Sequence, residues 1–165
     1  MKTLASKKLC LAAALFFAAA SIPSTASAES LLAFINRANN ATNTTTHVFA
    51  PLDNGGATSL TFKTTGANKV VKVSYNAECG VLGPTGSWQS VTILIDGVQA
   101  NPTSGTLFAF CTASSTSNYI WTGALRQSTL KVPLAGNHIV QVLIDLNAGA
   151  TNWWLGDSSI VVEQQ

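Results

Sequence analysis

The chain has 165 residues, of which 47% are hydrophobic and 10% are charged, and it carries a formal net charge of +2 at neutral pH. Its lysines and arginines are scattered, so no concentrated positive face is expected and nucleic-acid binding is set aside. No segment approaches the roughly 20 uninterrupted apolar residues that a transmembrane helix needs, so none is predicted.

The first 28 residues are typical of a secretory signal peptide. Lys2, Lys7 and Lys8 precede an apolar run over residues 9–20, and the segment ends in Ala26-Ser27-Ala28. Cleavage after Ala28 would leave residues 29–165 as one domain with seven acidic and six basic side chains, a formal charge of −1. We therefore expect a secreted protein, periplasmic or extracellular.

From Thr42 onward, short β-type runs alternate with Gly, Pro, Asn and Ser, which is the pattern of an all-β protein. Residues 31–38 also fit a helical stripe, but we predict a strand there, and a loop over residues 39–46. The predicted strands cover residues 31–38, 45–50, 58–63, 71–79, 88–95, 98 onward, 105–111, 118–125, 128–134, 140–146, 151–155 and 158–163.

Three of these strands carry positional information. Residues 71–79 alternate apolar and polar side chains, so one face should be buried. Pro133 places strand 128–134 at a sheet edge, because proline cannot donate a ladder hydrogen bond. Strand 140–146 breaks the alternation and is predicted to lie centrally. Asp96-Gly97 predicts a tight hairpin turn after strand 88–95. A two-layer antiparallel β-sandwich of jelly-roll-like type is the expected fold.

Removal of the signal peptide leaves two cysteines, Cys79 and Cys111, in a chain bound for an oxidising compartment. We predict that they form one structural disulfide between the layers. The competing interpretation is a reactive thiol or a metal pair, but neither cysteine has another cysteine or a histidine at ligand spacing.

The order of four segments resembles a loosely defined group of small secreted bacterial proteins of unknown function. These segments are residues 71–79, the turn at 95–98, Phe110-Cys111, and residues 153–159. The last hundred residues are also similar to jelly-roll domains of the C1q/TNF type. That second resemblance implies a trimeric binding domain without catalytic residues, and it transfers no functional residue to a position here.

Motifs for catalysis are weak, and we predict that the chain is not an enzyme. Gly156-Asp157-Ser158 begins like a lipase motif but precedes a final strand, so it is interpreted as a turn. The spacing of Ser128 and Lys131 matches Ser-x-x-Lys, which needs a helix to bring the two side chains together. A triad of His138, Asp145 and Ser158 has no support in spacing.

The acids leave one enzymatic alternative open, a small glycoside hydrolase with paired carboxylates. The candidates are Glu78, Asp96, Asp145, Asp157 and Glu163. No metal-binding motif is present, so we expect neither a metal site nor another cofactor, although loop carboxylates such as Asp157 could hold an incidental calcium ion.

The tryptophans give the most specific indication of function. Trp153 and Trp154 are adjacent, so on a strand one points into the core and the other to solvent or a partner. An exposed indole offers a flat apolar face to a sugar ring. Trp88 and Trp121 are further candidates. The alternative for all four is that they plug the ends of the sandwich.

The sequence therefore favours a non-catalytic module that binds carbohydrate or a surface protein. A structural or assembly component of an oligomeric surface structure is the alternative, because a chain with few charges suits burial between subunits as homo-oligomers require.

Overall fold

The computed structural model describes residues 29–103 and 108–165; the predicted signal peptide, residues 1–28, lies outside them. The described residues form strands and loops without a helix, hence no helix that could cross a membrane. The strands are β1 Ser30–Arg37, β2 Ala41–Asn43, β3 Val48–Phe49, β4 Leu60–Thr64, β5 Lys69–Leu82, β6 Trp88–Ile95, β7 Val98–Gln99, β8 Ala109–Thr112, β9 Thr122–Val132, β10 Gly136–Asn147 and β11 Asn152–Gln164.

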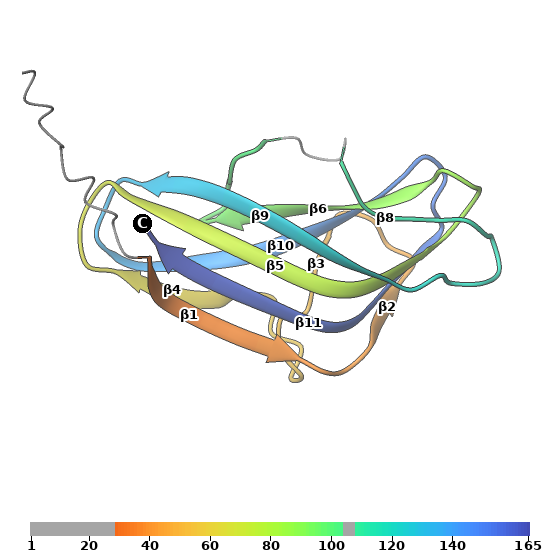
Figure 1. Ribbon diagram of the computed structural model, residues 1–165, viewed down its shortest axis with the longest axis horizontal. Helices are drawn as coiled ribbons and strands as arrows, with labels where there is room; N and C mark the ends of the chain where they lie inside the picture. Colours follow the sequence, from red (N-terminus) through yellow and green to blue (C-terminus); the bar gives the residue numbers. More distant parts are fainter. Residues whose placement is uncertain (1–28, 104–107) are drawn as a thin grey trace, which may run out of the picture.

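Two antiparallel sheets form the layers of a sandwich, which confirms the predicted fold class. The first sheet has the order β1-β11-β5-β9, with β2 also paired to β11. The second has the order β3-β10-β6-β7, with β4 on β10 and β8 on β6. Figure 1 shows the long strands β5, β9 and β11 running side by side in front of β6 and β10.

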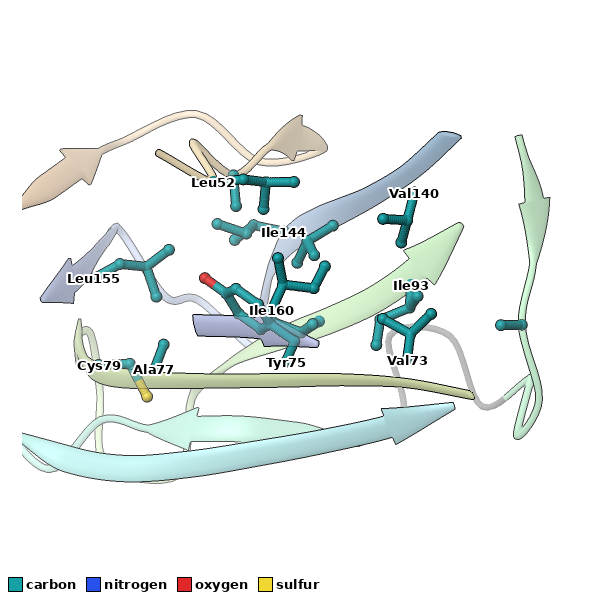
Figure 2. Packing of buried hydrophobic residues seen from close by; sticks show 14 of the residues in the cluster. Leu52, Val73, Tyr75, Ala77, Cys79, Ile93, Val140, Ile144, Leu155 and Ile160 are labelled. Atoms are coloured by element: carbon teal, nitrogen blue, oxygen red, sulfur yellow. The ribbon is translucent and has the colours of Figure 1, made fainter. Parts of the chain in front are cut away.

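The core lies between the sheets and follows the period-two pattern of the sequence. On β5, the side chains of Val71, Val73, Tyr75, Ala77 and Cys79 are all buried. Figure 2 shows Tyr75 and Ala77 facing the interior together with Ile160 of β11 and Ile93 and Ile144 of the second sheet. Burial of such β-branched and aromatic side chains stabilises the fold by about 1.5–3 kcal/mol per large side chain.

Cys79 and Cys111 form the predicted disulfide. Cys79 belongs to β5 of the first sheet and Cys111 to β8 of the second, so the bond connects the two layers. Both cysteines are buried. The bond lies at the end of β5 where Cys79 is paired with Leu155 on one side and Thr122 on the other.

Several strand predictions are confirmed in position. Residues 30–37 form a strand, β9 lies at the edge of its sheet, and β10 lies in the interior of the other. Asp96 and Gly97 both have positive φ, 51° and 78°, in the turn between β6 and β7. Glycine adopts this conformation without steric cost, which explains the tight turn.

Other boundaries were wrong. Residues 122–132 form one strand where two were predicted, and residues 152–164 likewise form one strand, interrupted by a bulge between Leu155 and Ser158. The predicted loop at 39–46 contains the short strand β2. Turn-forming residues such as Gly156 and Asp157 mark a strand end in the sequence, but within a wide sheet the neighbouring strands hold the chain through a bulge.

Candidate functional site

The Trp153-Trp154 pair occupies both faces of β11. Trp153 is buried, 3% exposed, and its indole Nε1 donates a hydrogen bond to the Thr45 carbonyl at 3.1 Å. Trp154 is half-buried and lies on the outer face of the first sheet, in register with Gly80 of β5 and Thr42 of β2. The predicted division of the pair between core and surface is therefore present, with Trp154 as the outer residue.

Three aromatic rings gather on this outer face. The ring centroids of Trp121 and Trp154 lie 3.8 Å apart at an interplanar angle of 49°, and Tyr119 stacks on Trp121 at 5.0 Å and 18°. Trp121, which immediately precedes β9, is 46% exposed. We call Tyr119, Trp121 and Trp154 the aromatic face.

Two glycines allow these rings to lie close to the backbone. A Cβ atom on Gly80 would lie 2.8 Å from Cε3 and Cζ3 of Trp121, and a Cβ atom on Gly156 would lie 2.5 Å from Cη2 of Trp154. Contacts this short do not occur at real side chains, so the rings occupy space that any other residue would fill. Gly123 of β9, on the same outer face, would meet nothing within 4 Å.

A carboxylate borders the aromatic face. Glu78 is exposed on the outer side of β5, between Asn76 and Gly80 in the alternation. Its Oε2 atom would lie 2.6 Å from a Cβ atom on Gly156, close to the edge of the Trp154 ring. Aromatic carbon atoms and carboxylate oxygens therefore lie side by side above Gly156.

A shallow hollow of about 330 Å³ lies further along the same face. Asn36, Ser159 and Asn76 line it from neighbouring strands, in consecutive register across β1, β11 and β5. Asp157, exposed on the β11 bulge, completes the polar lining. Along β5, Asn76 and Gly80 are four residues apart, so roughly 13 Å separates the hollow from the aromatic face.

Arg37 holds the bulge that lies between these two parts. The side chain is buried, and its guanidinium donates hydrogen bonds to the carbonyls of Leu155, at 3.2 Å, and Gly156, at 2.8 Å. It also bonds Ser158 Oγ at 3.3 Å and the Asn39 carbonyl. Burial lowers the pKa of Arg37, while negative charge at Asp157 opposes that change. Arg37 thus fixes the backbone from which Asp157 projects.

Trp88, the remaining predicted contact, belongs to the other layer. It is half-buried in β6 of the second sheet, with Thr112 and Asn147 as its strand neighbours. The structure therefore brings together Trp121 and Trp154 and places Trp88 and Trp153 elsewhere.

His138, Asp145 and Ser158 each contact other residues. His138 Nδ1 lies 2.6 Å from Asp96 Oδ2, and its Nε2 lies 3.1 Å from Thr64 Oγ1. Asp145 instead contacts His47 Nδ1 at 3.0 Å, and Ser158 bonds Arg37. Asp96, His138 and Thr64 form a hydrogen-bonded series in which the His138 imidazole and the Thr64 hydroxyl are buried. The series connects the β6–β7 turn to β10 and β4.

The candidate acids are similarly divided. Asp96 and Asp145 lie with histidines in the second sheet and its turns, whereas Glu78 and Asp157 lie on the outer face of the first sheet. Glu163 pairs with Lys72 at 3.0 Å, toward the opposite end of that sheet. Among residues 29–103 and 108–165, no three His, Cys, Asp or Glu side chains group as metal ligands would.

Comparison with known proteins adds no family. No protein-family model matches the chain, and no curated protein matches it. Among solved structures, dimeric latent PorU from Porphyromonas gingivalis aligns with 85% of this chain at 13% identity and a TM-score of 0.37. The catalytic domain of a GH87 alpha-1,3-glucanase in complex with nigerose aligns with 78% at 22% identity and a TM-score of 0.23. This chain covers 14% and 28% of those two chains.

Sequence reasoning missed part of the site. Tyr119 lay inside a predicted strand, Gly80 lay just beyond the predicted strand 71–79, and Gly156 was interpreted as a turn residue. One sequence signal for Gly80 was available. If the alternation of residues 71–79 is continued by one residue, Gly80 lies on the solvent side of the strand. The contact between Trp121 and Trp154 depends on strand order, which the sequence does not display.

Proposed function

We propose that this chain is a non-catalytic carbohydrate-binding β-sandwich and that the aromatic face is its binding surface. The observation that carries the proposal is the contact of Trp121 and Trp154 on the solvent side of a sheet, over backbone kept clear by Gly80 and Gly156. Exposed aromatic clusters mark interaction sites on soluble domains, and a flat indole suits the C–H face of a pyranose.

The polar groups around the rings support the same proposal. Glu78 can accept hydrogen bonds from sugar hydroxyls beside Trp154, and the amides of Asn36 and Asn76 can both donate and accept. The distance of roughly 13 Å from hollow to aromatic face exceeds one pyranose ring. A short oligosaccharide would lie along β5 and β11, with one ring on the indoles and another over the hollow.

The disulfide supports a location outside the cytoplasm. Structural disulfides persist in oxidising compartments and are rare where thiols are kept reduced. We propose that the domain acts in the periplasm or the extracellular medium, as the first 28 residues predict.

The test is a glycan array with the wild-type domain and the Trp154→Ala and Trp121→Ala variants. We expect binding to at least one glycan class and a loss of tenfold or more in affinity for each variant. Phe34→Ala is the matched control, because Phe34 is an aromatic side chain, 52% exposed, on β1 of the same sheet. Absence of glycan binding, or binding that both tryptophan variants retain, would overturn the proposal.

The assembly alternative has its own observation and its own measurement. Phe34 and Leu125 are 52% and 60% exposed. Val161 lies beside Phe34, but Ser74, Asn76 and Ser159 separate these two apolar residues from Leu125. Because the apolar side chains are interrupted by polar ones, this face favours a glycan over a second subunit. Light scattering that finds a stable trimer or larger species would favour assembly.

A further inference from the structure

The charged groups around the aromatic face indicate which class of glycan the site prefers, and this inference rests on the proposed function. We propose that the site selects glycans that carry free amino groups, and that Glu78 is the residue that recognises the ammonium.

The first argument is the position of the Glu78 carboxylate. Its Oε2 atom lies over Gly156 next to the Trp154 ring, so a sugar stacked on the indoles would present its substituents to this carboxylate. Glu78 is exposed to solvent on the outer side of β5. An ammonium there would replace water with a charge-assisted hydrogen bond.

The second argument is the distribution of positive charge over the described residues. Arg37 is buried, and its guanidinium is committed to carbonyls of the bulge. Lys72 lies toward the other end of β5 between Glu29, at 2.6 Å, and Glu163, at 3.0 Å. Lys69 and Lys131 lie at that same far end, and Lys63 belongs to the second sheet. Arg126 is paired with the buried Tyr75, on the other face of β9 from the aromatic face, where its guanidinium donates a hydrogen bond to the Pro102 carbonyl at 3.0 Å and lies over the Phe108 ring. The carboxylates of Glu78 and Asp157 therefore make the electrostatic potential near the aromatic face negative.

The rings of the aromatic face also favour a positively charged ligand. Indole and phenol rings attract a cation at their faces through the ring quadrupole, most strongly for tryptophan. The Trp154 ring lies next to the Glu78 carboxylate above Gly156, and Trp121 and Tyr119 continue the row of rings from Trp154. A cationic sugar gains from the rings and from the carboxylate, a neutral sugar gains stacking and hydrogen bonds, and an acidic sugar is repelled by both acids.

The experiment compares three oligosaccharides of equal length by calorimetry at pH 6 and low salt. These are a glucosamine oligomer with free amines, its fully N-acetylated counterpart and a galacturonic acid oligomer. We expect the free amine to bind at least tenfold more tightly than the acetylated form, and the uronic acid to bind most weakly. The amine preference should shrink as salt is raised, because part of it is screened.

Two variants assign the preference to a residue. Glu78→Gln should reduce the advantage of the free amine to less than threefold while retaining affinity for the acetylated oligomer. Glu163→Gln, which removes the same charge from the far end of the sheet, should keep the advantage.

The outcomes separate the two proposals. Equal binding of amine and acetylated forms, or an amine preference that survives in Glu78→Gln, overturns this inference and leaves carbohydrate binding standing. No binding of any of the three, together with a blank glycan array, overturns both.

Discussion

The indole rings of Trp121 and Trp154 lie in contact, 3.8 Å between centroids, although the two residues belong to opposite neighbours of β5. Trp154 is on β11 and Trp121 leads into β9, so the pair bridges across β5 at Gly80. Directly behind it, Cys79 pairs with Leu155 and Thr122 and connects to the second sheet. The proposed binding surface therefore lies next to the disulfide that connects the two sheets.

Gly80→Ala should displace the Trp121 ring. The added Cβ would lie 2.8 Å from two ring carbons, so the half-exposed indole must move, while the strand itself loses little stability. We expect a glycan affinity at least fivefold lower and an altered near-ultraviolet circular dichroism of the tryptophans, with a free energy of unfolding within about 1 kcal/mol of wild type.

Gly123→Ala is the matched control for that substitution. Gly123 lies on the same outer face, and its Cβ would meet nothing within 4 Å. Equal loss of affinity in both variants would contradict the role assigned to the clearance over Gly80.

Loss of the disulfide should weaken the fold and the site together. Closing a loop of this length stabilises a domain by roughly 3–4 kcal/mol through the entropy of the unfolded chain. Urea denaturation of the double variant Cys79→Ala/Cys111→Ala should give a free energy of unfolding lower than that of wild type by that amount. If the free energy of unfolding falls by less than about 1 kcal/mol, the bond contributes no more than local packing.

Arg37→Met should destabilise the protein by about 3 kcal/mol. The substitution keeps much of the volume but leaves the carbonyls of Leu155 and Gly156 without their buried donor. Urea denaturation measures the effect, and Lys131→Met, at an exposed position of β9, is the control. A variant as stable as wild type would show that the bulge holds its shape without the guanidinium.

Alkaline pH should weaken the fold through Tyr75. Burial raises the pKa of this phenol to about 12, against an ordinary value of 10.0. Because the folded-state pKa lies above the unfolded one, the stabilisation is complete below pH 10 and is lost as pH rises toward 12. The loss amounts to about 3 kcal/mol for two pKa units.

Tyr75→Phe should remove this part of the alkaline dependence. The buried Tyr75 hydroxyl interacts with Ser158 and Arg37, but these interactions lower its pKa by less than burial raises it, so removal of the hydroxyl should cost about 1 kcal/mol or less at neutral pH. Urea unfolding followed from pH 9 to 12 gives the comparison, with Tyr119→Phe as the control on the surface. An unchanged pH profile in Tyr75→Phe would assign the alkaline loss to other groups.

The fold could be predicted from local signals because they coincide with the tertiary arrangement. The alternation of Val71, Val73 and Tyr75 identified a buried face, and Pro133 identified an edge strand. The two cysteines that remain after removal of the signal peptide identified the disulfide between the layers. The two strand signals depend only on residues within one segment. The disulfide follows from the count of two cysteines.

The site was predicted only in part for a physical reason. The alternation rule divided Trp153 from Trp154 but could not say which was buried, because both faces of β11 carry apolar residues. The approach of Trp121 to Trp154 depends on β9 and β11 flanking β5, and the Asp96–His138 contact depends on β10 lying beside β6. Such pairings between distant strands are not encoded in the spacing of the residues they join.

The most direct test follows the four indole N–H signals in a ¹H–¹⁵N spectrum while the glycan that binds best on the array is added. Carbohydrate binding at the aromatic face predicts that the signals of Trp121 and Trp154 shift and saturate together, while those of Trp153 and Trp88 stay in place. Saturating shifts confined to Trp88 or Trp153, or no shift in any of the four, would contradict the account.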